Sequence, residues 1–102
     1  NFGVEVVQEM NRLGMLVDLS HVGYSTTMEA IEVSEQPVAF THAGPRALFD
    51  HPRNKTDEQL RALAAKGGVV GANAWPPILA AGNHATIWDF LDTVDYMVNL
   101  SA

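Results

Sequence analysis

The sequence has 102 residues, of which 47% are hydrophobic and 18% are charged, so it can form one packed domain and is neither of a disordered nor of a coiled-coil class. Twelve acidic residues against six basic ones give a formal net charge of −6, which argues against a general binder of nucleic acid or anionic membranes. The absence of cysteine excludes disulfides, thiolate metal sites and cysteine nucleophiles within this stretch.

Helices and strands are predicted to alternate from the first residues onward. Apolar residues at helical spacing predict a helix over residues 2–13, with Gly14 as its C-terminal cap. The mostly apolar run 15–20 then predicts a strand that is buried on both faces. Thr26 and Glu29 fit a capping box, which predicts that a second helix begins at this point.

The same alternation continues through the second half of the chain. A second strand is predicted over residues 38–41, and a long loop follows it. Thr56 and Gln59 form another capping box, which predicts a third helix. Residues 68–73 predict a third strand, and Thr86 is expected to begin the last helix.

Strands separated by crossover helices are typical of parallel βαβ units. Three strands that begin near residues 15, 37 and 68 would form a sheet with two open edges, whereas parallel sheets are normally covered on both faces. A closed (β/α)₈ barrel would need about 250 residues. We therefore predict an α/β fold in which residues 1–102 are a single fragment of a larger protein, with no internal domain boundary.

Two histidines occupy corresponding places one βα unit apart. His21 directly follows the first predicted strand, and His42 directly follows the second. Functional groups of parallel α/β folds gather just past the carboxyl ends of strands, and neighbouring strands lie about 4.8 Å apart, so the two imidazoles can converge on one centre. Neutral imidazole is a common zinc ligand. The pair predicts part of a metal site, and the alternative is that each histidine is a hydrogen-bonded structural residue.

Several other polar residues each allow two interpretations. Arg53 lies in the loop after His42, where it either clamps a carboxylate or phosphate or is a solvated loop arginine. Asp18 lies within the first predicted strand, and alternation turns it away from His21, which favours a structural hydrogen-bonding acid over a ligand. Asn73 ends the third strand and either lines the pocket or ties down the following loop.

Three ring side chains lie in the predicted loops. Trp75 either forms an apolar wall of the site or is ordinary packing, whereas surface or capping roles are expected for His51 and His84.

Four blocks of sequence follow one another along the chain. They are EMNRLGMLVDLSHV at residues 9–22, PVAFTHAG at 37–44, HPRN at 51–54 with DEQL at 57–60, and GGVVGAN at 67–73. In their order and spacing these blocks resemble the membrane (renal) dipeptidase family of zinc metallopeptidases. The resemblance covers essentially the entire chain.

This resemblance implies a specific fold and activity. It implies a partial (β/α)₈ TIM barrel, with about three of the parallel strands present here, and an enzyme that hydrolyses the peptide bond of dipeptides with a hydroxide held between two zinc ions. It further implies that His21 and His42 are ligands of one zinc ion and that Arg53 holds the free carboxylate of the dipeptide. The family's remaining ligands, a His-x-Asp pair and a bridging Glu, belong upstream of this segment, so the metal centre is expected to be incomplete here and the isolated fragment inactive.

Other possibilities stay open at the level of sequence. One is another metal-dependent barrel amidohydrolase that acts on a cyclic amide or lactone, and another is a catalytically inactive relative. The expected partner is a dipeptide rather than nucleic acid, and a homodimer is possible. The uncharged stretch 67–88 contains Pro76 and Pro77 and is not expected to span a membrane. The location is left open between the cytoplasm and the cell envelope, with a soluble enzyme of bacterial type expected.

Overall fold

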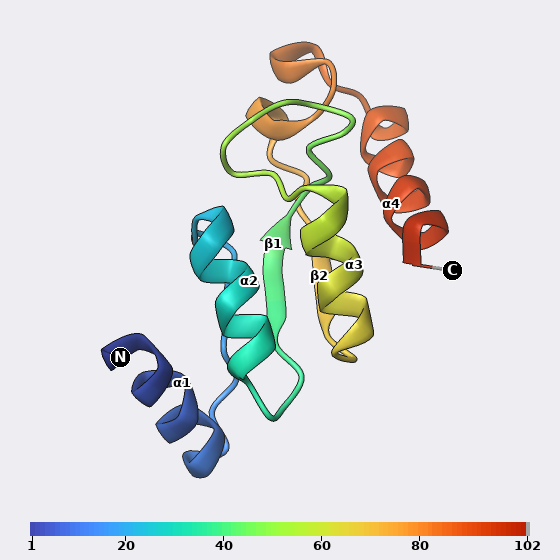
Figure 1. Cartoon of the computed structure of the whole chain (residues 1–102). Coiled ribbons are helices and arrows are strands. Elements are labelled where there is room, and N and C mark those ends of the chain that lie inside the picture. Colours follow the sequence, from blue (N-terminus) through green and yellow to red (C-terminus); the bar gives the residue numbers. More distant parts are fainter. Residues whose placement is uncertain (102) are drawn as a thin grey trace.

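The computed structural model describes residues 1–101, which form helices on one face of a small parallel sheet (Figure 1). The elements in chain order are α1 (Phe2–Leu13), α2 (Tyr24–Val33), β1 (Ala39–Ala43), α3 (Asp57–Ala65), β2 (Val69–Ala72), the 3₁₀ turns η1 (Pro76–Ile78) and η2 (Gly82–His84), and α4 (Ile87–Ser101).

The two strands form the parallel βαβ unit that the sequence predicted. Strand β1 pairs with β2 in parallel, with Ala39 opposite Val69, and α3 provides the crossover between them. Figure 1 shows α2 and α3 side by side in front of the strands, with α1 next to α2 and α4 next to α3. The core lies between these helices and the sheet, where Phe40 and Leu63 are buried. A mixed α/β architecture with crossover helices is therefore confirmed.

The first predicted strand is much shorter than expected. Within this segment only Asp18 forms a bridge, which pairs it with Ala39. The Leu19 N–H donates to the Ala39 carbonyl at 2.9 Å, and the Ala39 N–H donates to the Val17 carbonyl at 3.0 Å. The next bond of this ladder would join the Thr41 N–H to the Leu19 carbonyl. Instead the Thr41 N–H donates to the Asp18 carboxylate. The prediction of a full strand over residues 15–20 is therefore wrong, because a side chain takes the place of a backbone partner.

The prediction that this segment is buried on both faces is also wrong. Val17 and Leu19 are buried beneath the helices, whereas Leu16, which alternates with them, is 60% exposed. On β2 the side chain of Val69 is 68% exposed. Within residues 1–101 the helices thus cover one face of the parallel strands and leave apolar side chains on the other.

Two of the predicted helix ends are confirmed. Gly14 ends α1 in the left-handed conformation, with φ of 75°, as expected for a glycine cap. Thr56 and Gln59 form the predicted capping box of α3: the Gln59 N–H donates to the Thr56 hydroxyl oxygen at 3.2 Å, and the Thr56 N–H donates to Gln59 Oε1 at 2.9 Å. Both ends are specified by local sequence.

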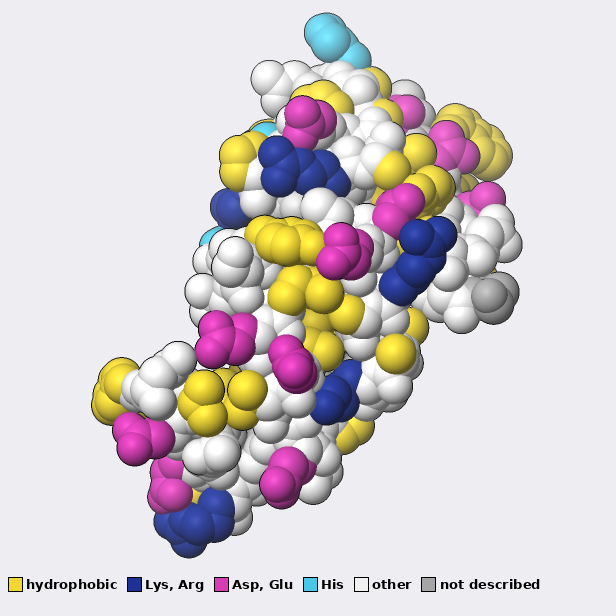
Figure 2. Space-filling view, in the orientation of Figure 1, with side chains coloured by type: hydrophobic (Ala, Val, Ile, Leu, Met, Phe, Trp, Pro, Cys, Tyr) yellow, Lys and Arg dark blue, Asp and Glu magenta, His cyan; other side chains and the backbone are white. Residues whose placement is uncertain are grey.

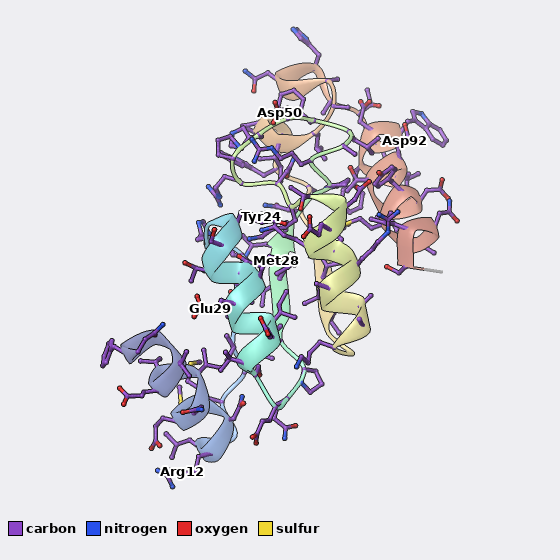
Figure 3. All side chains as sticks on the ribbon, viewed as in Figure 1. Arg12, Tyr24, Met28, Glu29, Asp50 and Asp92 are labelled. Carbon is purple, nitrogen blue, oxygen red and sulfur yellow. The ribbon has the colours of Figure 1, made fainter. Side chains whose placement is uncertain are left out.

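The predicted capping box at Thr26 and Glu29 is wrong. Helix α2 begins at Tyr24, after Gly23, so Thr26 lies within the first turn. Figure 3 shows Tyr24 near the end of α2 that faces the loops and Glu29 further along the helix. The Glu29 carboxylate accepts a hydrogen bond from the side chain of Asn1 instead of reaching back to Thr26. The contact between α1 and α2 therefore replaces the expected cap.

No helix among residues 1–101 combines the length and the apolar character that a membrane crossing needs. The uncharged stretch 67–88 instead contains β2 and both 3₁₀ turns before α4 begins. On the face drawn in Figure 2, acidic and basic side chains are interspersed, without a continuous basic area.

Candidate metal and substrate site

The structure brings His21, His42 and Arg53 together at the end of the sheet where both strands finish. His21 follows the short bridge segment, and His42 lies within β1, near its carboxyl end. The two Nε2 atoms are 2.7 Å apart, and the imidazole centroids are 4.7 Å apart. Arg53 Nη2 lies 3.1 Å from His21 Nε2. Three side chains from three separate segments therefore converge on one point.

A set of hydrogen bonds to the Asp18 carboxylate holds the two histidine-bearing segments together. The Ser20 hydroxyl donates to Oδ1 at 2.7 Å, and the Thr41 hydroxyl donates to Oδ2 at 2.7 Å. The backbone N–H groups of Ser20 and Thr41 donate to Oδ1 as well, each at 3.1 Å. Partial burial alone would raise the pKa of Asp18, but these four donors outweigh it and hold the pKa well below its usual range. These bonds match the structural role that alternation favoured.

Arg53 is held by its neighbours in the loops after the strands. Its guanidinium carbon lies 5.3 Å from the centroid of the Trp75 ring, a cation–π contact. The backbone N–H of Arg53 donates to His51 Nδ1 at 3.1 Å, so His51 holds the turn that carries Arg53 and does not cap a helix. Trp75 is partly exposed and contacts His51 and Arg53, so it is not part of the core, and its place as a wall of the site stays a prediction.

Asn73 ties down the loop that carries Trp75. Its side-chain oxygen accepts a hydrogen bond from the Trp75 N–H at 3.2 Å, and its own N–H donates to the Ala43 carbonyl at 3.0 Å. Of the two interpretations of Asn73 left open by the sequence, the structure therefore supports the structural one.

Lys55 is a buried cation that sequence reasoning missed. Its ammonium donates to the carbonyls of Leu19 at 2.7 Å and Val22 at 3.0 Å, on either side of His21. The ammonium also lies 4.8 Å from the centroid of the Phe40 ring. Burial lowers the pKa of Lys55, although the charge of Asp18 acts in the opposite direction. The lysine thus holds the turn that presents His21.

Replacement of Lys55 is expected to destabilise the protein. In Lys55→Met the hydrocarbon chain remains, but the carbonyls of Leu19 and Val22 each lose a charged donor and keep only a neutral one, so we expect the free energy of unfolding to drop by about 2–4 kcal/mol. Urea unfolding of the full-length protein that carries this sequence measures the change. Lys66→Met is the control, because Lys66 donates to only one carbonyl, that of Ser34, far from the histidines. An equal and small effect of both variants would contradict the role of Lys55.

The donor set suits zinc but supplies only part of its coordination. Two nitrogen ligands of one tetrahedral zinc ion lie about 3.3 Å apart, given Zn–N bonds near 2.0–2.1 Å, so the Nε2 atoms of His21 and His42 need to separate only slightly. Within residues 1–101 no group of three or more His, Cys, Asp or Glu side chains is placed to hold a metal ion. The described residues therefore provide two converging imidazole nitrogens and no complete metal site.

Comparison with known proteins identifies the family. Residues 1–101 match the profile of the membrane dipeptidases, peptidase family M19. The chain belongs to the membrane dipeptidase family. Uncharacterized dipeptidase C965.12 of Schizosaccharomyces pombe is 38% identical over 102 residues, which cover 98% of this chain and 24% of that protein.

Solved structures of related proteins share the fold of this membrane dipeptidase segment. An amidohydrolase from Pseudomonas aeruginosa has a TM-score of 0.95 and 44% identity over 100% of this chain and 31% of its own. A metallopeptidase from Rhodobacter sphaeroides, liganded with a phosphinate mimic of the dipeptide L-Ala-D-Ala, has a TM-score of 0.90 and 27% identity over 96% of this chain and 29% of its own. The chain thus spans less than a third of the length of these relatives.

Proposed function

We propose that this chain supplies one side of the active site of a zinc-dependent dipeptidase. In this proposal His21 and His42 are ligands of one of two zinc ions, and Arg53 binds the free carboxylate of the dipeptide. The observation that carries the proposal is the convergence of the two Nε2 atoms, 2.7 Å apart, with the Arg53 guanidinium beside them. A cation site next to a carboxylate site suits a substrate whose scissile bond lies close to its free carboxyl end.

The proposal includes a (β/α)₈ barrel for the full-length protein. Parallel strands with crossover helices on one face are the repeating unit of that fold, and its functional residues lie at the carboxyl ends of the strands. The exposed face that carries Leu16 and Val69 is the face that a closed barrel would bury. An uncovered apolar face on a parallel sheet supports this larger architecture.

Each residue of the site has a distinct task in the hydrolysis. Bound zinc supplies Lewis acidity, which polarises a peptide carbonyl and lowers the pKa of water. Neutral His21 and His42 each provide one nitrogen lone pair to the cation. Arg53 offers a planar set of N–H donors to a carboxylate, and its contact with Trp75 orients that plane. Arg53 therefore fixes the distance between the carboxyl end of the substrate and the metal, which restricts substrates to short peptides.

The Rhodobacter sphaeroides relative supports dipeptides as the substrate class, since it is liganded with a dipeptide mimic. The Pseudomonas aeruginosa relative, described as an amidohydrolase, favours a second candidate: a metal-dependent hydrolase of cyclic amides or lactones. Dipeptides and cyclic amides or lactones offered to the same full-length protein distinguish the two. A catalytically inactive relative would turn over neither class.

Removal of the metal is the direct test of the proposed function. We expect a chelator to abolish dipeptide hydrolysis by the full-length protein and stoichiometric zinc to restore it, because the proposal makes the converging His21 and His42 ligands of a zinc ion on which hydrolysis depends. Elemental analysis before and after chelation measures the zinc content. Full hydrolysis by protein shown to be free of metal would refute the zinc-dependent mechanism.

A further inference from the structure

The hydrogen bonds behind His42 determine which of its ring nitrogens carries the proton. The Asp18 carboxylate accepts four hydrogen bonds. Its lowered pKa keeps the carboxylate ionised, so it acts only as a hydrogen-bond acceptor. The Thr41 Oγ1 atom lies 2.7 Å from Asp18 Oδ2, which commits the hydroxyl hydrogen of Thr41 to that bond. Thr41 Oγ1 then has only lone pairs left for its other neighbours.

His42 is one of those neighbours. Its Nδ1 lies 2.9 Å from Thr41 Oγ1. Because the Thr41 hydrogen is committed to Asp18, Nδ1 must be the donor in this contact and must carry the ring proton. In the neutral ring Nε2 is then unprotonated, and its lone pair points toward His21 Nε2 at 2.7 Å.

His21 presents the same kind of nitrogen from the opposite side. Arg53 Nη2 can only donate, and it lies 3.1 Å from His21 Nε2, so that nitrogen also carries a lone pair. In the neutral rings, both Nε2 atoms are therefore unprotonated acceptors, 2.7 Å apart. The Arg53 guanidinium occupies the single lone pair of His21 Nε2. A metal cation that displaces this contact would meet an unprotonated nitrogen on each ring, so the hydrogen bonds prepare both rings for a cation.

We propose that Asp18 and Thr41 are positioning residues, which lock His42 in the Nδ1–H tautomer so that its Nε2 is available to a metal cation. This inference rests on the proposed function, since it takes His42 as a ligand. Ser20 contributes a second restraint, because its hydroxyl oxygen accepts the His42 backbone N–H at 3.1 Å while its hydroxyl hydrogen goes to Asp18. Ligating histidines commonly donate their other N–H to an outer partner, and loss of that partner typically costs about 10- to 100-fold in metal affinity.

The hydrogen bonds that run from Asp18 through Thr41 to His42 form a relay, and two substitutions break this relay in different ways. In Asp18→Asn, Oδ1 can keep its three donors, which puts the amide nitrogen opposite Thr41 Oγ1. The amide then donates to Thr41, the Thr41 hydroxyl hydrogen turns to His42 Nδ1, and the ring proton moves to Nε2. Thr41→Val removes the hydroxyl at nearly constant volume and leaves Asp18 in place. Thr41→Ser is the matched control, because it keeps the hydroxyl.

The test uses the metal-free, full-length protein with ¹⁵N-labelled histidine. Long-range ¹H–¹⁵N correlation spectra at about pH 8, where imidazole is neutral, identify the tautomer of His42, and competition with a chromophoric chelator gives the zinc affinity. We expect the Nδ1–H tautomer in the wild type and Thr41→Ser. Asp18→Asn and Thr41→Val are expected to gain the Nε2–H tautomer and to bind zinc about 10- to 100-fold more weakly.

The outcomes separate this inference from the proposed function. Unchanged tautomer and unchanged zinc affinity in both Asp18→Asn and Thr41→Val would overturn the relay. A changed tautomer with unchanged zinc affinity would overturn its positioning role. If the wild type binds no zinc but the tautomer of His42 still differs between the wild type and Thr41→Val, the relay is supported and the zinc dipeptidase proposal fails.

Discussion

Replacement of His21 by alanine is expected to abolish zinc binding at this site and dipeptide hydrolysis together. His21 provides one of only two imidazole nitrogens that converge here within the described residues. Loss of an outer partner already costs about 10- to 100-fold, so loss of a ligand itself should cost more than about 100-fold in both properties. The full-length protein is the material for both measurements, with zinc content from elemental analysis and hydrolysis of a free dipeptide from product release.

A matched substitution controls for the loss of any histidine. His84 lies exposed in η2 and has no contact with the other two rings, so His84→Ala should leave zinc content and hydrolysis at wild-type levels. Retained hydrolysis with full zinc content in His21→Ala would remove His21 from the ligand set, and with it the observation on which the proposed function depends.

The convergence of His21 and His42 could be predicted from sequence because it follows from topology. Each histidine comes at the end of a parallel strand or bridge segment, and the ends of neighbouring parallel strands must lie at one edge of the sheet. The placement of Asp18 followed in the same way from alternation along an extended chain. Neither prediction required knowledge of side-chain packing.

Lys55 and Thr41 could not be predicted in this way. A lysine in a polar loop is normally solvated, and only the folded chain brings the carbonyls of Leu19 and Val22 to its ammonium. Thr41 fits a strand by propensity alone, so nothing in its local sequence indicates that its hydroxyl links Asp18 to His42. An unpaired charge within a strand, such as Asp18, was the one signal that partners had to exist.

The shortened first strand has a related cause. Its sequence pattern predicts extended backbone correctly at Asp18, which bridges Ala39, although burial alternates along the segment instead of extending to both faces. However, the Asp18 carboxylate takes the Thr41 N–H, and the Lys55 ammonium takes the Leu19 carbonyl, so the ladder stops after one bridge. Asp18 and Lys55, which interrupt the strand pairing, also hold the segments that carry His42 and His21. Regular backbone pairing is therefore lost at the edge where these two histidines converge.

Replacement of Arg53 by alanine is expected to slow hydrolysis of substrates that have a free carboxyl end and to leave hydrolysis of substrates without one nearly unchanged. Charge-assisted hydrogen bonds contribute about 1.5–3 kcal/mol each, so loss of the guanidinium and its donor pair should lower kcat/KM for a free dipeptide by about 100-fold or more. The corresponding dipeptide amide, which lacks the carboxylate, should be hydrolysed at nearly the rate of the wild type. Steady-state kinetics of both substrates with the full-length protein measure this ratio.

The neighbours of Arg53 make this experiment specific. Arg53→Lys keeps the charge but loses the planar donor pair and the guanidinium contact with Trp75, so it should recover only part of the loss on the free dipeptide. Arg46→Ala is the control, because Arg46 lies in the same loop and pairs with Asp50, not with the histidines. Since Arg53 also contacts His21 Nε2, a role in holding the metal ligand would instead reduce hydrolysis of the dipeptide and the amide equally and would lower zinc affinity. Selective loss on the free dipeptide, with zinc affinity unchanged, therefore identifies Arg53 as the carboxylate-binding residue.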